Sequence, residues 1–160
     1  MKYYSKLLNK EFNFKEKKGL IFCYNDSSLD SCVYQHIVPN GKKYYGITRQ
    51  NPAKNRWNNG AGYVKNKKFF ADILEYGWNN IEHYILTSYI TLIEAFYYEY
   101  ALIIRDKTYN DDFGYNHEKI DINYFIKNYT QNENDCFLLN EILQQYANVS
   151  IAELLKRSDV

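Results

Sequence analysis

The stretch CVYQHIVPNGKKYYGIT at residues 32–48 gives the clearest indication of the fold. Two runs of β-branched and aromatic residues lie on either side of Pro39-Asn40-Gly41, and such runs favour β-strands. Proline fixes the first central position of a type I turn, and a glycine two residues later can supply the left-handed residue of a G1 bulge. The stretch therefore predicts a β-hairpin with a three-residue loop.

The length of this loop decides which residues face each other across the hairpin. A three-residue loop places His36 opposite Tyr44 and Tyr34 opposite Gly46, so that both tyrosines and His36 share one face. A two-residue Asn-Gly loop would instead place the tyrosines on opposite faces. Two phenols near a glycine form either an ordinary aromatic cross-strand pair or a polar cluster around a small ligand group.

Length and composition limit the possible classes of protein. A chain of 160 residues is long enough for one domain with its own core, with or without a short appendage. The N-terminal residues do not have the apolar run of a signal peptide. No other apolar run is long enough to span a bilayer. We therefore expect a cytoplasmic protein without membrane partners. Cys23, Cys32 and Cys136 lack metal-ligand spacing and are expected to be reduced thiols.

The charged residues are distributed unevenly, although the formal net charge is only +1. Residues 41–68 contain eight basic residues and no acidic ones, whereas residues 71–160 contain fifteen acidic and six basic residues. Binding of phosphate groups depends on such a local positive potential. Because tyrosines and a tryptophan lie between the basic residues, the segment favours a nucleic-acid surface over its alternative, a solvated lysine-rich face.

The segments after the hairpin are predicted to form helices and one further strand. Asn51-Pro52 is typical of an N-cap followed by proline at the first helical position, so a short helix should carry Arg56. Residues 67–76 predict a second helix that ends at Gly77. Its inward-facing residues are expected to be Phe69, Phe70, Ile73 and Leu74. Residues 81–88 alternate well enough to form a third strand beside the hairpin.

The longest predicted helix spans about residues 91–106 and opens with the capping box Thr91-x-x-Glu94. Its apolar face is traced by Leu92, Ala95, Phe96, Leu102 and Ile103. Glu99 lies in the middle of this face. Because a buried carboxylate is costly without a cation, Glu99 should belong to an ion pair, reach the rim of the core, or bind a metal ion.

Three shorter helices are predicted near residues 122–129, 135–146 and 151–157, the last with a Ser-x-x-Glu capping box. This segment is acidic, so packing or dimer contacts are favoured over insertion into a DNA groove. Residues 1–18 are predicted to form either a short helix or an arm laid on the core.

Cys32-Val33-Tyr34 and Tyr44-Tyr45-Gly46 resemble the two halves of the motif that defines the GIY-YIG nucleases. The order of the later features is also similar to that family: Arg56-Trp57, Gly60-Ala61-Gly62-Tyr63, Glu75-Tyr76-Gly77-Trp78, Glu99 and Gly114-Tyr115-Asn116. The resemblance implies an α+β fold, a small three-stranded antiparallel sheet flanked by helices. It also implies an N-terminal arm or helix over residues 1–31, a catalytic domain over 32–117 and a helical C-terminal extension over 118–160.

The resemblance further implies a metal-dependent DNA endonuclease that hydrolyses phosphodiester bonds with a single Mg²⁺ or Mn²⁺ ion. Glu99 would be the one protein ligand of that ion, and Arg56 would hold the scissile phosphate through paired hydrogen bonds. Tyr34 would be the general base or would position the water, helped by Tyr44. Asn116 would contact the substrate or brace Glu99.

Two departures from the family pattern affect these roles. Cys32 replaces the first glycine of the motif, which a strand should tolerate. Many members carry a histidine one helical turn after the arginine, and Gly60 stands there instead. The second base is therefore open between Tyr63 and His36. The side chains expected to contact nucleic acid are His36, Lys43, Lys65, Lys67, Lys68 and Asn116.

A second hypothesis is a non-catalytic nucleic-acid-binding or regulatory protein that keeps the nuclease fold. Loss of Arg56 or Glu99 would have marked such a protein, and both residues are present. The C-terminal helices offer a contact for a homodimer. Only about 45 residues follow Asn116, fewer than the DNA-binding arrays of homing endonucleases, so phage, mobile-element, restriction and defence roles all stay open.

Overall fold

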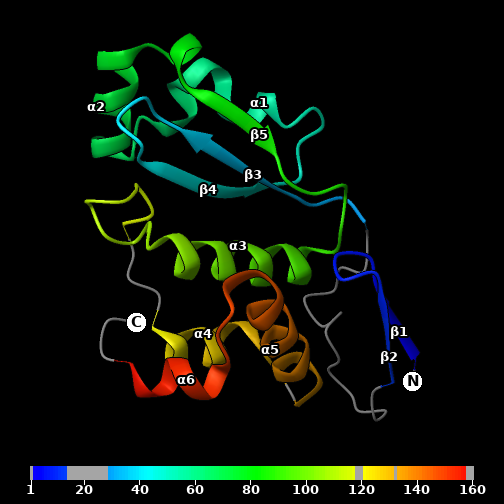
Figure 1. The fold of residues 1–160 in the computed structure, drawn as a ribbon. Coiled ribbons are helices and arrows are strands. Elements are labelled where there is room, and N and C mark those ends of the chain that lie inside the picture. Colours follow the sequence, from blue (N-terminus) through cyan, green and yellow to red (C-terminus); the bar gives the residue numbers. More distant parts are fainter. Residues whose placement is uncertain (1, 14–28, 118–120, 132, 158–160) are drawn as a thin grey trace.

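The computed structural model describes residues 2–13, 29–117, 121–131 and 133–157, and its elements form layers around a three-stranded sheet (Figure 1). The sheet consists of β3 (Cys32–Ile37), β4 (Lys43–Thr48) and β5 (Glu82–Ile85). Its strand order is β4-β3-β5, and both pairs are antiparallel. This confirms the α+β class and the third strand beside the hairpin.

The β3–β4 hairpin has the predicted register, with His36 paired with Tyr44 and Tyr34 paired with Gly46. The loop glycine, Gly41, has a φ of +89°. Its N–H closes the turn through a 2.8 Å hydrogen bond to the carbonyl oxygen three residues earlier. The three-residue loop is therefore confirmed, and the left-handed conformation explains why glycine stands at this position.

Four short helical segments cover one face of the sheet: α1 (Lys54–Trp57), η1 (Asn58–Tyr63), α2 (Lys67–Tyr76) and η2 (Trp78–Asn80) (Figure 1). Gly77 ends α2 with a φ of +86°, as predicted. Together with the hairpin these segments enclose an aromatic core. Its buried residues include Tyr34, Trp57, Tyr63, Phe69, Ile73 and Tyr115.

Two details of this layer correct the sequence prediction. The cap residue of α1 is Ala53, whose side chain makes no capping hydrogen bond, so the predicted Asn51-Pro52 cap is wrong. Leu74 is 71% exposed instead of buried, because only the face of α2 that carries Phe69 and Ile73 meets the sheet. An apolar residue at the edge of a helical stripe does not reveal how wide the covered face is.

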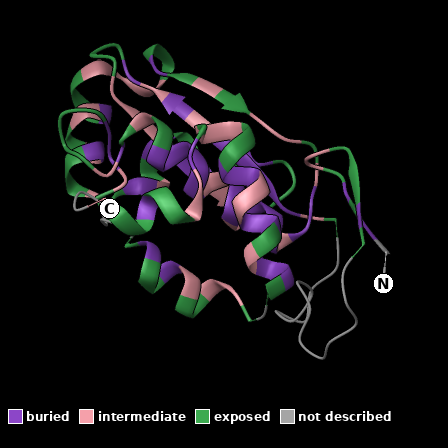
Figure 2. Cartoon of the chain, turned by 60° about the horizontal axis from the view of Figure 1, so that its bottom comes forward, coloured by how far each residue is buried: buried purple, intermediate pink, exposed green. Residues whose placement is uncertain are grey.

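The other face of the sheet is covered by α3 (Leu92–Asp106), which is the most buried helix of the described chain (Figures 1 and 2). The Thr91 hydroxyl accepts a 3.3 Å hydrogen bond from the Glu94 N–H, so the predicted cap is confirmed. The Glu94 side chain is itself completely buried, and the hydroxyl of Tyr3 donates to its carboxylate. The capping box predicted the backbone role of Glu94 but not the burial of its side chain.

Beneath α3 lie α4 (Ile122–Tyr129), α5 (Glu133–Ala147) and α6 (Ile151–Lys156) (Figure 1). The three C-terminal helices are therefore confirmed, and α5 is slightly longer than predicted. Apolar residues of α3 and of all three helices belong to one hydrophobic core. The C-terminal segment thus completes the core on the side of α3 that faces away from the sheet.

The N-terminal residues form a second hairpin of β1 (Lys2–Ser5) and β2 (Lys10–Asn13), which corrects the alternative of a short helix. The hairpin packs on the core as an arm, since Tyr3 and Phe12 belong to the core of α3 and α5. The Tyr146 hydroxyl also donates to the Leu7 carbonyl oxygen at 3.2 Å. The rest of the predicted N-terminal segment, residues 14–28 with Cys23, lies outside the described residues.

Cys32 and Cys136 are free thiols, Cys32 being buried. Within the described ranges, none of the helices has the length and apolar character needed to cross a bilayer.

Candidate active site

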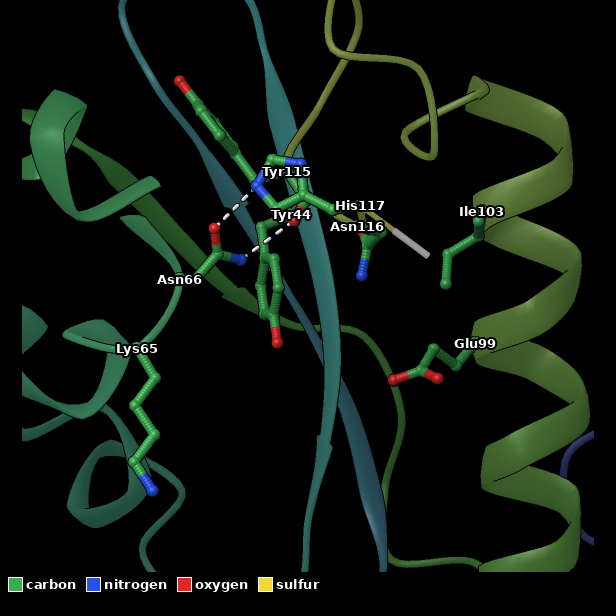
Figure 3. A pocket seen from close by; sticks show the side chains of 8 residues that line it. All are labelled: Tyr44, Lys65, Asn66, Glu99, Ile103, Tyr115, Asn116 and His117. Atoms are coloured by element: carbon green, nitrogen blue, oxygen red, sulfur yellow. Dashed lines mark hydrogen bonds between the residues drawn. The ribbon is translucent and has the colours of Figure 1, made fainter. Parts of the chain in front are cut away.

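A cavity of about 440 Å³ opens beside β4 (Figure 3). The elements that meet there are β4, α3, the segment that precedes α2, and the stretch at residues 115–117. The cavity is lined by Tyr44, Lys65, Asn66, Glu99, Ile103, Tyr115, Asn116 and His117. The fold therefore brings the second half of the hairpin motif and the predicted metal ligand to one place.

Glu99 projects from α3 toward the cavity (Figure 3). No other described residue forms a hydrogen bond or ion pair with its carboxylate. Burial raises the pKa of this carboxyl from 4.5 to about 8, because the charged form has lost much of its water. Of the alternatives open from the sequence, an internal ion pair is therefore wrong for the described chain, and a cation would relieve the cost of the charge.

The donor set around Glu99 limits which cation could bind. Among the described residues, no three or more His, Cys, Asp and Glu side chains cluster so that they could hold a metal ion. Mg²⁺ and Mn²⁺ accept a site with one carboxylate, because water and substrate phosphate fill the other positions. The single oxygen-donor group of Glu99 fits this kind of ion and does not fit a closed structural zinc site.

Of the two hairpin tyrosines, Tyr44 lines the cavity, whereas Tyr34 does not and is only 1% exposed. A Cβ at Gly46 would overlap the Tyr34 hydroxyl, so glycine leaves room for that phenol. Burial is the largest cause of the raised pKa of both hydroxyls; the charge of Glu99 raises these pKa values further and that of Arg56 lowers them. Both charged groups therefore act on the tyrosine pair.

Arg56, from α1, lies close to this pair without lining the cavity. Its Nη1 donates a 2.8 Å hydrogen bond to the Gly62 carbonyl oxygen. Its guanidinium carbon is 5.1 Å from the centre of the Tyr63 ring. A Cβ at Gly62 would clash with Arg56, so glycine permits this close approach. The other guanidinium N–H groups have no partner among the described residues and stay available to an anion.

Tyr63 begins a chain of hydrogen-bonded groups behind the tyrosine pair. Its hydroxyl oxygen is 3.1 Å from that of Tyr34 and 2.7 Å from Nε2 of His36. The Nδ1 atoms of His36 and His83 are 2.9 Å apart. Nε2 of His83 is 3.1 Å from the carbonyl oxygen of Trp78. The chain thus connects a motif tyrosine with a histidine on β5.

The structure corrects the interpretation of His36 and adds His83 to the site. His36 was expected to contact nucleic acid, but it is completely buried, so its side chain cannot touch a bound strand. Burial also lowers the pKa of His36 to about 2, which keeps the imidazole neutral. The sequence provided no argument for His83, although the strand at 81–88 was predicted. The missing information was the register, which pairs His83 with His36.

Asn116 braces the edge of β4 and not Glu99. Its Oδ1 accepts a 3.1 Å hydrogen bond from the Tyr45 N–H, and its Nδ2 donates to the Tyr45 carbonyl oxygen at 2.8 Å. The side-chain amide therefore takes the place of a neighbouring strand at this point of the edge. Asn116 also lines the cavity, so contact with a substrate remains compatible with its position.

The four lysines predicted to contact nucleic acid differ in whether a carboxylate already neutralises their charge. Lys65 is exposed and lines the first cavity. Lys67 and Lys68 line a second open cavity of about 430 Å³ that shares His117 with the first. Lys68 is paired with Asp111. Nζ of Lys43 lies 3.6 Å from Asp106 Oδ2, so a carboxylate partly neutralises its charge.

Asn66 and His117 also line the cavity, although the sequence provided no argument for either residue. The Asn66 side chain caps α2 and donates to the Tyr115 carbonyl oxygen at 2.9 Å. Its Oδ1 also lies 2.7 Å from Nε2 of His117 (dashed in Figure 3). An asparagine before a helical pattern is a recognisable capping signal, but its contact with the segment at 115–117 is tertiary.

No protein-family model matches the chain, and comparison with curated proteins and with solved structures finds no significant match.

Proposed function

We propose that the protein is a metal-dependent DNA endonuclease of the GIY-YIG type that hydrolyses phosphodiester bonds. The observation that carries this proposal is Glu99, a carboxylate without a partner among the described residues, which enters a cavity lined by a motif tyrosine. The resemblance of the hairpin and of the later motifs to the family agrees with this arrangement.

A phosphodiester resists hydrolysis because it is anionic. An enzyme must generate a nucleophilic hydroxide, place it in line with the leaving group and neutralise the charge that develops on the phosphate. The proposed site holds a candidate group for each of these tasks within the fold described above.

Glu99 would hold one Mg²⁺ or Mn²⁺ ion through its carboxylate oxygens. Such an ion, when bound, supplies charge neutralisation at the phosphate and lowers the pKa of coordinated water. A bound cation would also lower the pKa of Glu99 and keep its carboxylate ionised. Stability of the folded chain should therefore respond to the ion even without substrate.

Arg56 would bind the scissile phosphate. Its guanidinium is held by Gly62 and by the Tyr63 ring, so it is positioned before a substrate arrives. Its planar fork of N–H donors matches two phosphate oxygens. Lys65, at the same cavity, and Lys67, at the adjoining one, would bind flanking phosphates.

Tyr44 and Tyr34 would position and activate the water. Tyr44 faces the cavity, so its hydroxyl is the phenol that can contact a nucleophile directly. Because burial raises the pKa of both phenols, a stable phenolate is unfavourable at neutral pH. The phenols therefore need a route along which a proton can leave.

Incubation of plasmid and of mixed single-stranded, duplex and branched DNA with the protein tests this proposal. Cleavage is expected with Mg²⁺ or Mn²⁺ and should stop when EDTA is added. Sequencing of the product ends would identify the preferred DNA structure. Binding of DNA without any cleavage would contradict the proposal and would favour the non-catalytic alternative.

A further inference from the structure

The hydrogen bonds behind the tyrosine pair can be satisfied in only one order when the imidazoles are neutral. The Trp78 carbonyl oxygen accepts hydrogen bonds only, so the nitrogen of His83 that faces it, Nε2 at 3.1 Å, must carry a proton. A neutral His83 then presents a lone pair at Nδ1. His36, whose Nδ1 lies 2.9 Å away, must donate from that atom.

The same reasoning extends from His36 to the tyrosines. With its proton on Nδ1, His36 accepts at Nε2, so the Tyr63 hydroxyl at 2.7 Å donates to it. Either hydroxyl of the Tyr63–Tyr34 pair, whose oxygens are 3.1 Å apart, can donate to the other. Because the single proton of Tyr63 is directed to His36, Tyr34 is the donor in this order. The resting order therefore runs in one direction, from Tyr34 through Tyr63 and His36 to His83.

The buried members of this chain are unsuited to carry a charge. Tyr34, Tyr63 and His36 are 1%, 2% and 0% exposed. Burial raises the pKa of the two phenols and lowers that of His36, in each case because the charged form loses its water. A shift of one proton along each bond leaves all three neutral, since His36 changes only from one tautomer to the other.

His83, at the far end, is better placed than His36 to accept a charge. Burial lowers the pKa of His83 too, but the hydrogen bond to the Trp78 carbonyl oxygen raises it. Its side chain is partly exposed on β5. Its ring stacks on Trp78, with 4.0 Å between the ring centres, and on Trp57, with 5.5 Å. Indole faces attract cations, and solvent can take a proton from a partly exposed imidazolium.

We propose that Tyr34, Tyr63, His36 and His83 form a proton wire that carries the proton of the attacking water away from the cavity. This inference rests on the proposed nuclease function and identifies the terminal base, which the family pattern leaves open in this chain. Tyr63 and His36 are conducting members of the wire, and His83 is the group that takes up the proton.

At each step of the proton transfer, one bond to hydrogen breaks and one forms. Tyr44 lines the cavity beside Tyr34, with 6.4 Å between the two ring centres. The water O–H bond breaks and its proton joins the Tyr44 oxygen, while Tyr44 passes its own proton to Tyr34. Tyr34 and Tyr63 do the same in turn, and His36 gains a proton at Nε2 and gives one from Nδ1 to Nδ1 of His83. The products are hydroxide and the His83 imidazolium, which then releases a proton to solvent.

Nitrogen NMR of the free protein tests the resting order without any cleavage assay. In uniformly ¹⁵N-labelled protein at neutral pH, His36 should be protonated on Nδ1 and His83 on Nε2. These tautomers are distinguished by their ¹⁵N shifts and by couplings to ring protons. A His36 ring protonated on Nε2 would reverse the chain and overturn the proposal.

His83→Gln tests the terminal acceptor in the full chain. The glutamine oxygen can accept from His36 and its amide can donate to the Trp78 carbonyl, but it cannot take up a proton. We expect kcat to fall at least tenfold, with KM and the melting temperature close to those of the wild type. Tyr84→Gln is the matched control, because Tyr84 is exposed on the same strand, and this variant should cleave normally.

Tyr63→Phe provides a second test if the glutamine variant does not fold, since it keeps the ring and removes one hydroxyl from the wire. It should show the same fall in kcat. Wild-type kcat in either folded variant would overturn the wire and leave the nuclease proposal standing. Absence of cleavage by the wild type would overturn both.

Discussion

At the scale of single residues, the burial of the Glu99 carboxyl lowers the stability of the fold when the group is ionised, and the same carboxylate is the proposed metal ligand. The unfolded chain binds a proton at this carboxyl with a pKa near 4.5, whereas burial raises the folded pKa to about 8. Between these values the folded state holds the proton more tightly than the unfolded state. Its stability therefore falls as the pH rises from about 4.5 to about 8, provided that no cation is bound.

Glu99→Gln should remove this pH dependence, because glutamine does not ionise. In EDTA at pH 8 we expect the variant to be more stable than the wild type by on the order of 2–4 kcal/mol, and at pH 4 the two should be nearly equal. Urea unfolding at both pH values measures this difference. Glu75→Gln, at an exposed carboxylate of α2, is the control and should leave the pH dependence unchanged.

Mg²⁺ provides the complementary measurement on the same proteins. It should raise the melting temperature of the wild type at pH 8 and should have no effect on Glu99→Gln. An equal response of the two proteins would mean that the ion binds elsewhere.

Gly46→Ala should damage the site through packing alone. The added Cβ would overlap the Tyr34 hydroxyl, so the phenol must shift; such overpacking typically costs about 1–3 kcal/mol. We expect cleavage to be lost together with this stability. In Gly41→Ala the new Cβ meets nothing within 4 Å, and only the strain of a φ of +89° remains. That control should lose some stability but keep its activity, which thermal melts and a cleavage assay would show.

The sequence allowed the cross-strand pairing of the hairpin residues to be predicted, but not how deeply each side chain is buried. Turn chemistry fixed the register, so Tyr34 beside Gly46 followed from local rules. Whether Tyr34 or Tyr44 reaches the cavity, and whether His36 is buried, depends on helices that are distant in the sequence. Local patterns carry little information about such tertiary cover.

At the scale of elements, β4 is an edge strand that the side chain of Asn116 covers. Removing that amide leaves the N–H and C=O of Tyr45 without these partners. We expect Asn116→Ala to lose about 1–3 kcal/mol of stability and part of its activity, because Tyr44 lies next to the released backbone. Chemical unfolding and cleavage rates would measure the two effects. Asn123→Ala, at an exposed position of α4, should change neither.

The elements themselves differ in how well local rules predicted them. The caps of α3 and α6 and the terminal Gly77 of α2 follow sequence signals, and all three are present. The four residues of α1 are too few to be stable alone, so packing decides where that helix begins. The N-terminal hairpin likewise forms against a core whose other members lie far along the chain.

At the scale of the whole molecule, the layers separate the charges. The basic segment at 41–68 contains β4, α1 and η1. Helix α5, with three acidic residues and no basic ones, lies with α4 and α6 on the other side of α3 (Figure 1). Nucleic acid should therefore approach the cavity from the side of β4 and α2, away from the C-terminal layer. A homodimer through the C-terminal helices stays a prediction.

Replacing Lys65, Lys67 and Lys68 by alanine should weaken DNA binding at low salt and flatten its salt dependence. Each lost phosphate contact lowers the slope of log K against log salt by about 0.9, so loss of Lys65 and Lys67 lowers it by about 2. Lys68 should add less, because it is paired with Asp111. Fluorescence anisotropy over a range of salt concentrations gives this slope. The matched triple variant at Lys10, Lys127 and Lys156 should behave as the wild type; an equal loss in that protein would place the DNA elsewhere.

The most direct measurement of the central claim compares cleavage by the wild type, Glu99→Gln and Glu75→Gln at equal DNA occupancy with Mg²⁺ or Mn²⁺. We predict that the wild type and Glu75→Gln cut DNA, and that Glu99→Gln binds it with similar affinity but does not cut. Undiminished cleavage by Glu99→Gln would contradict the account.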